Sequence, residues 1–282
     1  MRKGEIPKIY GLLGYPVRHS LSPAMHAAAF KKLKLNGIYL LFEARRENFT
    51  ATLKKLKLMG VSGFNVTVPY KEEIVPHLDK LDESAARVGA VNTVLNKGGK
   101  LTGYNTDGRG FIRSLRSDLG FRVKGKNIFI VGAGGAARAI GFSLAQEKAR
   151  TVTFYDVIPE RAAKLAGDIG KTFPSVRVSS VDSCVCSYSF ADLIVNASSC
   201  GMKMSDPLPV DPKLLSRKAL VYDIIYSPAP TKFIRSARAA GIKGVNGEGM
   251  LLGQGALAFR IWTGRNAPQD VMRRALRIDR RT

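Results

Sequence analysis

The sequence predicts an α/β protein of two domains, and three observations support this prediction. Its 282 residues suffice for about two domains of roughly 150 residues each. Apolar runs of strand length alternate with helical patterns, which is typical of strand-helix-strand units and parallel sheets. One strand ends in a glycine-rich turn that leads into a helix. A composition with 45% hydrophobic, 8% aromatic and 24% charged residues excludes a disordered, collagen-like or low-complexity chain.

The first 107 residues contain the first set of elements. A strand over Ile9–Leu13 precedes a Gly-Tyr-Pro turn, and a helix runs from about Pro23 to Leu35. Two strands, two helices and a hairpin follow: strands at 39–43 and 63–68, helices from about 48 and 69, and a hairpin of 91–95 and 100–103 around Asn96-Lys97-Gly98-Gly99.

A second set of elements begins beyond Asp107. It comprises a helix to about Leu119, strands at Asn127–Val131, Thr151–Tyr155, Asp192–Asn196 and Ala219–Ile225, and a helix that ends near Glu147 between the first two of these strands. In doubly wound sheets, ligands bind beyond the carboxyl ends of the strands. We therefore expect residues 196–199 and 226–228 to border a ligand.

The glycine-rich turn indicates which ligand. Residues 132–137 read Gly-Ala-Gly-Gly-Ala-Ala, a Gly-x-Gly-x-x-Ala pattern between a strand and a helix. The first glycine allows the tight turn, the second lets the backbone approach a pyrophosphate, and the small third residue lets helix and strand pack. The helix N-terminus supplies amide donors. The pattern predicts a dinucleotide site, although such a fingerprint alone is weak evidence.

Asp156 strengthens the prediction. It ends the second strand of this domain, 22 residues after Gly134. A carboxylate at that place can accept hydrogen bonds from the ribose hydroxyls of NAD and repels the additional phosphate of NADP. A helix-capping aspartate is the alternative interpretation.

The charge of the chain suggests a different class of partner. With 45 Lys+Arg and 22 Asp+Glu, the net charge is +23, which a nucleic-acid-binding protein would explain directly. The excess is spread over both halves, with 17 basic and 9 acidic residues up to Asp107 and 28 and 13 beyond it. No block of five or six like charges and no nucleic-acid recognition motif is visible. We therefore expect no nucleic-acid partner.

Cysteines and histidines give no metal signal. The three cysteines cannot form a paired framework or a four-ligand zinc site, and the three histidines are far from them in sequence: Cys184, Cys186, Cys200, His19, His26 and His77. No signal peptide or membrane span is recognised. A reducing, cytoplasmic location is the simplest expectation.

Polar side chains of the N-terminal half gather just after predicted strands. Ser20 and Ser22 offer two hydroxyls that can bind a carboxylate, and Ser22 before Pro23 also suits a helix cap. Asn65 and Thr67 alternate along a strand and therefore share one of its faces.

A lysine and an aspartate form a candidate proton-transfer pair. Lys71 is expected in the first turn of the helix from Pro69, where the helix dipole disfavours a cation and so favours proton transfer. An exposed lysine without function explains the position equally well. Asp107 precedes a helix that it could cap; near Lys71 it would also orient the ammonium group. The sequence leaves open whether the two side chains meet.

Together these motifs resemble the shikimate dehydrogenase family, from about Ile9 to the end of the chain. The resemblance rests on separate motifs in the right order: GYPVRHSLSP at 14–23, GFNVTVPYKE at 63–72, GAVNT at 89–93, NTDG at 105–108, the glycine-rich turn, NASSCGM at 196–202, and GEGML at 247–251 with Gln254.

The resemblance implies a domain layout and a reaction. Residues 1–107, completed by the C-terminal helices of residues 247–282, would form an α/β substrate domain, and residues 108–246 a Rossmann-type doubly wound dinucleotide-binding domain. The expected reaction is reversible hydride transfer between 3-dehydroshikimate and shikimate, on the route to chorismate and the aromatic amino acids. It requires no metal.

The resemblance also implies the role of each site residue. Ser20 and Ser22 would hold the substrate carboxylate, and Lys71 would exchange the hydroxyl proton while Asp107 orients it. The other substrate-binding residues would be Asn65, Thr67, Asn92, Tyr226 and Gln254. The cofactor-binding residues would be Gly132, Ala133, Gly134, Gly135, Ala136, Asp156, Asn196, Ala197, Ser198, Ile225 and Gly247.

One position departs from the commonest family pattern. Many members have Asn-Arg-Thr after the second cofactor strand, with the arginine on the NADP phosphate, whereas this chain has Asp156-Val157-Ile158. We therefore expect NAD as cofactor. Members that prefer NAD include enzymes acting on quinate, so quinate is an alternative substrate, although Ser22 keeps the shikimate pattern.

Two further classes of function remain as alternatives. A non-catalytic NAD-binding regulator would keep the glycine-rich turn but could lose Lys71 or Asp107, and both are present. A nucleic-acid-binding protein would show salt-dependent retention on DNA. The resemblance is compatible with a monomer or a homodimer.

Overall fold

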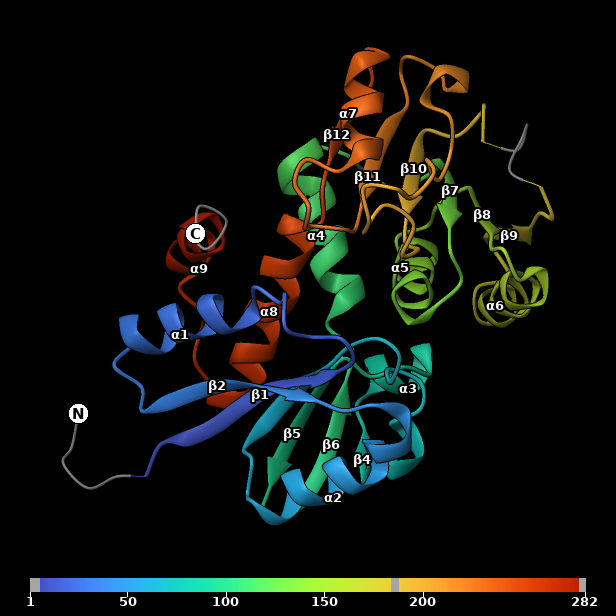
Figure 1. Cartoon of the computed structure of the whole chain (residues 1–282). Helices are drawn as coiled ribbons and strands as arrows, with labels where there is room; N and C mark the ends of the chain where they lie inside the picture. The colour runs from blue at the N-terminus through green and yellow to red at the C-terminus, as the bar shows by residue number, and fades with distance from the viewer. Residues whose placement is uncertain (1–5, 184–187, 279–282) are drawn as a thin grey trace. The chain divides into compact units, whose positions relative to one another are not determined.

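The chain forms two compact units, each with its own sheet (Figure 1). The structure is a computed structural model that describes residues 6–183 and 188–278. One unit is Met1–Thr106 with Leu252–Thr282, and the other is Asp107–Leu251. The second crossing between units thus lies at Leu252, whereas the sequence predicted Gly247. Two units with α/β architecture confirm the predicted fold class.

The N-terminal unit contains a six-stranded sheet. Its strands and helices are β1 (Lys8–Gly14), α1 (Ser22–Lys32), β2 (Gly37–Glu43), α2 (Phe49–Leu58), β3 (Gly63–Val66), β4 (Lys80–Leu81), α3 (Glu83–Val88), β5 (Thr93–Lys97), β6 (Lys100–Tyr104) and α9 (Gln269–Ile278), with short 3-10 helices at Arg46–Asn48 and Val75–His77. Helix α8 (Glu248–Thr263) contributes its residues from Leu252 onward.

The strand order of this sheet is β2-β1-β3-β5-β6-β4. The pairs β1·β2, β1·β3 and β4·β6 are parallel, while β5 is antiparallel to both β3 and β6. The sheet is therefore mixed, because the hairpin of β5 and β6 reverses the chain inside it. Helices α1 and α2 cover opposite faces of the sheet (Figure 1), and α1 packs against α9.

A helix that the sequence predicted from Pro69 is absent, and this expectation is wrong. Residues 69–74 form successive turns, in which the amide of Tyr70 donates to Thr67 and that of Ile74 donates to Tyr70. Only a 3-10 helix at Val75–His77 follows. Proline is tolerated in the first turn of a helix, so Pro69 does not explain the absence, but Pro76 would lie in the interior, where it lacks an amide hydrogen and its ring clashes with the carbonyl of residue 72.

An aromatic cluster fills one side of the N-terminal unit. Tyr10 stacks on Phe30 and Trp262 with ring centroids 5.2 and 5.3 Å apart. The Trp262 indole donates a hydrogen bond of 2.9 Å to the carbonyl of Val94. Trp262 lies in α8 and Val94 in β5, so this bond attaches the C-terminal part of the unit to the middle of its sheet.

The second unit is a doubly wound domain. Its strands and helices are α4 (Asp107–Leu119), β7 (Asn127–Val131), α5 (Gly135–Gln146), β8 (Thr151–Tyr155), α6 (Pro159–Thr172), β9 (Arg177–Ser180), β10 (Leu193–Asn196), β11 (Leu220–Asp223), α7 (Lys232–Ala239) and β12 (Lys243–Val245), with a 3-10 helix at Pro212–Leu214. Strands β7 and β8 have the bounds that the sequence predicted.

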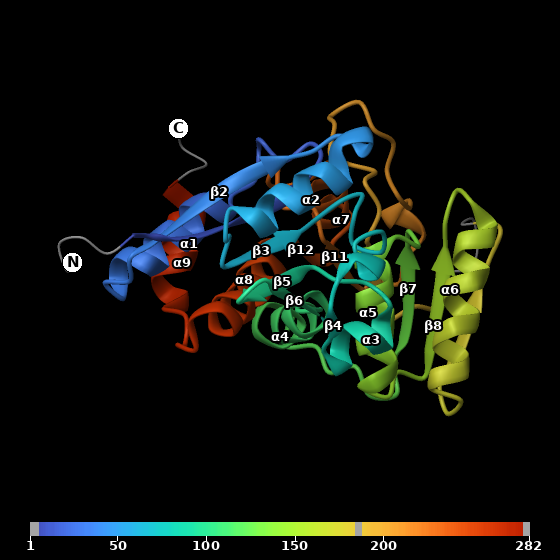
Figure 2. The ribbon, with the colours of Figure 1, turned by 90° about the horizontal axis from the view of Figure 1, so that it is seen from below.

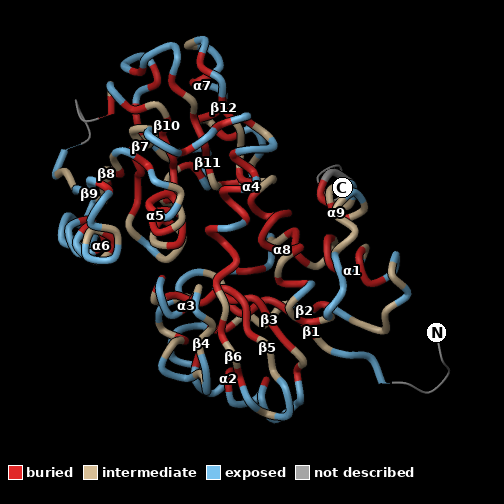
Figure 3. The backbone as a smooth tube through the Cα atoms, turned by 180° about the vertical axis from the view of Figure 1, so that it is seen from behind, coloured by how far each residue is buried: buried red, intermediate tan, exposed pale blue. Residues whose placement is uncertain are grey.

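All strand pairs of the second sheet are parallel, in the order β12-β11-β10-β7-β8-β9. The order reverses between β7 and β10, because β8 and β9 extend to one side and β11 and β12 to the other. Helix α6 lies beside β8 (Figure 2) and also packs against β9. The central strands are buried (Figure 3), whereas β9 at the edge is partly exposed. The reversal creates the place where doubly wound domains bind ligands.

Gly63 provides a test of the packing around Trp262. A Cβ on Gly63 would lie 2.4 Å from the Trp262 ring and 2.8 Å from the carbonyl of Val94. We expect Gly63→Ala to lower the free energy of unfolding by about 2–4 kcal/mol, through overpacking and loss of the indole hydrogen bond. Chemical denaturation measures the change.

Gly167→Ala is the matched control for that substitution. Gly167 lies inside α6, and nothing would come within 4 Å of a Cβ there. Alanine should therefore stabilise the helix by about 0.5–1 kcal/mol. A Gly63→Ala protein as stable as the wild type would contradict the tight packing described for Trp262.

Candidate active site

The loop after β1 carries the two serines predicted to hold a carboxylate. The amide of Ser22 donates to the Ser20 hydroxyl oxygen at 3.2 Å. Ser22 is the first residue of α1, the N-cap residue is Leu21, and no side chain caps this helix. The interpretation of Ser22 as the helix cap is therefore wrong, because Ser22 already lies inside the helix.

Glu43 holds the same loop from the end of β2. Its carboxylate accepts from the Val17 amide at 3.4 Å and from Arg18 Nε at 2.9 Å. The Arg18 hydrogen bond, the first of several causes, lowers the pKa of Glu43, so the carboxylate is ionised over a wide pH range. The loop that leads to Ser20 thus has a fixed charged anchor.

Three buried amide side chains come together in the N-terminal unit. Asn65 donates to the Asn92 carbonyl at 3.0 Å, and Asn92 Nδ2 lies 3.4 Å from Gln254 Oε1. All three residues are at most 9% exposed. Asn65 lies in the inner strand β3, Asn92 precedes β5, and Gln254 comes from α8, so the structure brings together three residues that are far apart in the sequence.

Thr67 and Lys71 lie beyond the end of β3. The Thr67 amide donates to the Leu13 carbonyl at 2.9 Å and its carbonyl accepts from Tyr70. The Lys71 carbonyl accepts from the Val91 amide at 2.7 Å, which brings its backbone next to the segment that carries Asn92. Since no helix begins at Pro69, the dipole argument for Lys71 does not apply. The lysine is held by turns instead.

Asp107 is the first residue of α4, and it is 4% exposed. It follows Thr106 directly in the chain, and the Thr106 amide donates to Asn92 Oδ1 at 2.8 Å. Asp107 belongs to the second unit and Lys71 to the first, so their pairing stays a prediction, as does the role of Tyr226 toward the substrate.

The glycine-rich turn has the geometry that a dinucleotide requires. Gly132 has a φ of +103°, and a Cβ there would lie 2.9 Å from Ala197 and Ser198 backbone atoms. Gly134, by contrast, faces open space: nothing would lie within 4 Å of a Cβ. Among the described residues no side chain caps α5, so its first-turn amides can donate to a ligand. These residues fit the pyrophosphate of a dinucleotide.

Asp156 lies beside this turn, as the pattern predicted. One carboxylate oxygen accepts from the Ala133 amide at 2.7 Å and the other accepts from the Ile158 amide at 2.9 Å. The carboxylate therefore fixes the start of the glycine-rich turn and caps its own loop. Both interpretations of this residue, as ligand for a ribose and as structural cap, are compatible with these bonds.

A buried aspartate connects the loops after β10 and β11, on the other side of the place where the strand order reverses. Asp223 Oδ1 accepts from Asn196 Nδ2 at 3.0 Å and from the Ile225 amide at 3.1 Å, while Oδ2 accepts from the Thr231 hydroxyl at 2.7 Å. Asn196 and Ile225 are both predicted cofactor-binding residues. Asp223 thus holds the loop after β10 against the loop after β11.

The remaining residues of the predicted cofactor site lie near these two loops. The Ser198 amide and hydroxyl both donate to Asn196 Oδ1, at 3.2 and 2.7 Å. Gly247 packs on the end of β11, where a Cβ would lie 1.9 Å from the Ile224 carbonyl oxygen, and its amide donates to Ile225 at 3.2 Å. Any residue larger than glycine at position 247 would displace the backbone of Ile224, just after β11.

Burial raises the pKa of Asp223 to about 6, although its three hydrogen bonds favour the charged form. Asp223 was not predicted from the sequence, because it ends an apolar strand. An acidic side chain within Val-Tyr-Asp-Ile-Ile is the signal that could have identified it. Tyr39 and Thr93, which contact Asn65, were also not predicted as residues of the site.

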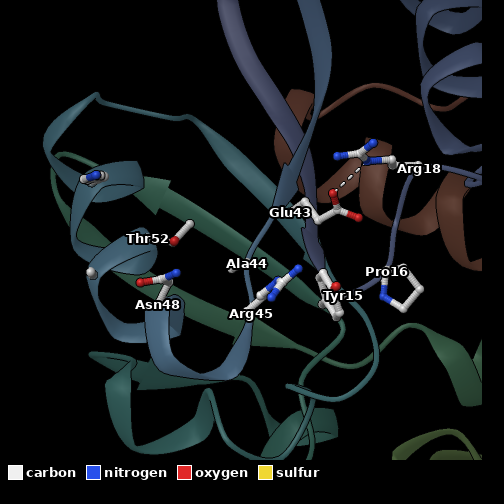
Figure 4. Close-up of a pocket in the computed structure, with 10 residues that line it drawn as sticks. Tyr15, Pro16, Arg18, Glu43, Ala44, Arg45, Asn48 and Thr52 are labelled. Carbon is white, nitrogen blue, oxygen red and sulfur yellow. Dashed lines mark hydrogen bonds and ion pairs between the residues drawn. The ribbon is translucent and has the colours of Figure 1, made fainter.

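A separate cavity of about 670 Å³ lies between the loops after β1 and β2 and helix α2 (Figure 4). Its polar lining includes Arg18, Glu43, Arg45 and Lys55, and Arg45 lies 5.6 Å above the Tyr15 ring. None of the predicted substrate or cofactor residues lines it. Arg18 and Glu43 form an ion pair at one side of it (Figure 4), so half of these charged side chains are already engaged with each other.

The described part of the chain holds no cluster of three or more His, Cys, Asp or Glu side chains that could bind a metal ion. Cys184 and Cys186 lie outside the described residues, and the Cys200 thiol is free, with Sγ 3.2 Å from the Pro207 carbonyl oxygen. Among the described helices, none has the length and apolar character needed to cross a bilayer.

Two family models match the chain at its ends. Residues 12–94 match the Shikimate dehydrogenase substrate binding domain, and residues 247–277 match the Shikimate 5'-dehydrogenase C-terminal domain. A curated relative from Moorella thermoacetica, "Shikimate dehydrogenase (NADP(+))", is 45% identical over 95% of this chain and 92% of its own. The chain belongs to the shikimate dehydrogenase family.

Solved structures of the family have the same fold. Shikimate 5-dehydrogenase from Thermus thermophilus, in complex with NADP(H) and shikimate, is 38% identical with a TM-score of 0.86, over 96% of this chain and 99% of that one. The enzyme from Listeria monocytogenes, in complex with shikimate and NAD, is 35% identical with a TM-score of 0.85, over 96% of each chain. Membership of the family confirms the resemblance that the motifs predicted.

Asp223 generates a prediction about stability and pH. Its pKa in the folded protein is raised to about 6 from 3.8, so the folded chain binds this proton more tightly than the unfolded chain. The resulting stabilisation is present below about pH 4 and is lost as the pH rises through 6. Asp223→Asn removes this loss and keeps an oxygen for Asn196 and Ile225. The variant should gain up to about 3 kcal/mol over the wild type between pH 4 and 6.

Urea denaturation of both proteins from pH 4 to 7 measures this difference. Other titrating groups, such as the buried His26, whose pKa burial lowers to about 3, act equally in both proteins and cancel. Identical pH dependence in wild type and variant would show that folding does not raise the pKa of Asp223. Thr231→Val, which removes one donor to the carboxylate, should raise the pKa of Asp223 further and extend the loss of stability to higher pH.

Proposed function

We propose that this member of the family interconverts 3-dehydroshikimate and shikimate with a nicotinamide dinucleotide. The observation that carries the proposal is the convergence of Asn92 and Gln254, 162 residues apart in sequence, in one buried amide cluster. The segment that contains Asn92 is the one matched by the family's substrate binding domain, and Gln254 lies in the part matched by its C-terminal domain. Relatives named for shikimate support the same substrate.

Separate residues of this chain would bind the substrate and transfer the proton. Ser20 and Ser22 bind the carboxylate, and the Ser20 hydroxyl is already oriented by the Ser22 amide. Thr67, Asn92 and Gln254 bind ring hydroxyls, with Tyr226 also at the substrate. Lys71 accepts or returns the proton at the oxygen of the reacting hydroxyl group, and Asp107 orients its ammonium group. A bound nicotinamide dinucleotide supplies the hydride acceptor or donor.

The helix N-terminus of α5 and the loops joined by Asp223 would hold that dinucleotide. Backbone amides at Gly134 to Ala136 would bind the pyrophosphate, and Asn196 to Ser198, Ile225 and Gly247 would border the remainder. The net charge of +23 attracts both anionic ligands, which would raise their rate of arrival at low salt. A cytoplasmic location and a monomeric or dimeric state accompany this proposal as predictions.

Asp156 supports NAD as the preferred form of the cofactor. Two backbone amides hold its carboxylate, so it cannot turn away from an arriving ligand without losing both hydrogen bonds. A 2'-phosphate would meet this negative charge, and the next two residues, Val157 and Ile158, provide no cation for it. The relative from Moorella is named for NADP(+), whereas the Listeria structure contains NAD, so this choice varies within the family.

Initial rates test the proposed reaction. We expect turnover of shikimate that exceeds turnover of quinate, and a fall in kcat of several orders of magnitude for Lys71→Ala with little change in the KM for shikimate. The loss follows because no other group is assigned to the hydroxyl proton. Lys80→Ala, an exposed lysine in β4, is the matched control and should keep wild-type rates. Unchanged kcat in Lys71→Ala would remove this lysine from the mechanism.

Cofactor selection is tested by three proteins. The wild type should have a higher kcat/KM with NAD than with NADP, because a like-charge contact disfavours the bound 2'-phosphate. We expect a difference of roughly tenfold or more, which corresponds to about 1.4 kcal/mol or more. Val157→Arg adds a cation but keeps the Asp156 carboxylate, so it should reduce the preference for NAD over NADP. Replacing residues 156–158 by Asn-Arg-Thr should give a higher kcat/KM with NADP than with NAD. A wild type that prefers NADP would refute the role given to Asp156, without affecting the proposed reaction.

A further inference from the structure

A buried tyrosine hydroxyl binds to the amide cluster, which consists of Asn65, Asn92 and Gln254. Tyr39, in β2, is 7% exposed, and its hydroxyl lies 2.9 Å from Asn65 Oδ1. The bond joins an edge strand to β3, two strands away in the sheet order. The phenol is the donor, because a carbonyl oxygen can only accept. The oxygen of the Asn65 amide is therefore directed at Tyr39.

The orientation of Asn65 then fixes its amide nitrogen. Nδ2 donates to the Asn92 carbonyl and to the Thr93 hydroxyl, each at 3.0 Å. If the amide were turned over, its oxygen would face the Asn92 carbonyl oxygen, and two acceptors would be in contact without a proton between them. The Tyr39 hydroxyl and the Asn92 carbonyl thus favour the same arrangement.

Thr93 links the orientation of the Asn65 amide to that of the Asn92 amide. Because the Thr93 oxygen accepts from Asn65, its own proton is available for Asn92 Oδ1, 3.1 Å away. Asn92 Oδ1 also accepts from the Thr106 amide at 2.8 Å. With its oxygen engaged on that side, Asn92 presents Nδ2 to the Thr106 hydroxyl at 2.9 Å and to Gln254 Oε1 at 3.4 Å.

We propose that Tyr39 is a positioning residue for the substrate: through Asn65 and Thr93, its hydroxyl fixes the orientation of the Asn92 amide. The inference rests on the proposed function, in which Asn92 and Gln254 bind ring hydroxyls. A hydroxyl group that meets the amide nitrogen of Asn92 must accept, and one that meets its oxygen must donate. The orientation therefore decides which hydrogen-bonding pattern of the ring is recognised.

The ring of Tyr39 is held in place by stacking. His26 lies parallel to it, with centroids 4.5 Å apart and an interplanar angle of 6°. His26 is fully buried, and neither of its ring nitrogens has a hydrogen-bond partner among the described residues. Trp262 lies against the other rings of this cluster, 5.3 Å from His26 and 6.2 Å from Tyr39. Aromatic packing thus fixes the position of the phenol ring, and its hydroxyl group reaches Asn65.

The same contacts change the interpretation of Asn65. The resemblance to the family implied that Asn65 binds the substrate, and that role stays a prediction. Its side chain is 4% exposed, with its oxygen on Tyr39 and its nitrogen on Asn92 and Thr93. We therefore infer that Asn65 acts on the substrate through its neighbour Asn92.

Tyr39→Phe removes the hydroxyl and keeps the stacking ring. We expect the KM for shikimate to rise about three- to tenfold, which is the loss of roughly one hydrogen bond. The KM for the dinucleotide should stay at its wild-type value, and kcat should fall less than the KM rises. Steady-state kinetics with each substrate varied in turn, together with shikimate binding by calorimetry, provide these values.

Tyr10→Phe is the matched control. Tyr10 lies in β1 directly opposite Tyr39, is 2% exposed and stacks in the same aromatic cluster. Among the described residues its hydroxyl makes no hydrogen bond to the amide cluster. Tyr10→Phe should therefore leave the KM for shikimate unchanged, while any general effect of losing a buried hydroxyl on stability appears in both variants.

Thr93→Val tests whether Tyr39 acts through the chain of hydrogen bonds. The substitution removes the link between Asn65 and Asn92, so it should raise the KM for shikimate by a similar factor. The double variant with Tyr39→Phe should then show no greater KM than the more affected single variant. Two independent structural effects would multiply instead. If Tyr39→Phe fails to fold, Thr93→Val alone carries the test.

The outcomes separate this inference from the proposed function. Wild-type turnover of shikimate with an unchanged KM in Tyr39→Phe, or in Thr93→Val where the first variant does not fold, overturns the inference alone. KM effects that multiply in the double variant also overturn it. Absence of turnover and of shikimate binding in the wild type overturns the proposed function and the inference together.

Discussion

The buried amide of Asn92 is the constraint around which the N-terminal unit is organised. An amide that is only 2% exposed must find most hydrogen-bond partners for its oxygen and its nitrogen within the protein. Asn92 does so with Thr93, Thr106 and Gln254, which come from β5, from the residue before α4 and from α8. One side chain thereby sets the mutual positions of segments that lie far apart in the sequence. In the second unit, buried Asp223 joins separate loops in the same way.

Much of the fold could be predicted from the sequence, because it depends on local patterns. The strands β7 and β8 are apolar runs with clear boundaries, and the glycine-rich turn between β7 and α5 has a strict steric requirement at Gly132. The expectation of a helix from Pro69 failed for a reason that is only partly local. The segment is tied by turns and by the bond of Val91 to Lys71, and this partner lies 20 residues away along the chain.

The site itself could be predicted only as a set of residues. The sequence itself indicated Ser20, and the resemblance to the family implied Asn92 and Gln254, but neither contains information on which polar atom meets which. Tyr39 belongs to an expected strand with aromatic and aliphatic neighbours, so nothing in its surroundings suggested a polar role. Its contribution depends on pairing between β1 and its two neighbours, which places Tyr39 and Asn65 on one side of the sheet. Such long-range pairing is visible only in the structure.

The helix α5 has consequences beyond the binding of a ligand. It begins at the glycine-rich turn without a side-chain cap, and Gly134 faces open space. The amides of its first turn therefore lack the stabilisation that a serine or aspartate cap would supply, about 1 kcal/mol. A dinucleotide bound at the turn would supply hydrogen-bond acceptors for these amides in place of a side-chain cap. The folding equilibrium of this unit is thus linked to the concentration of its ligand, so that a supply of dinucleotide in the cell protects the protein from unfolding and degradation.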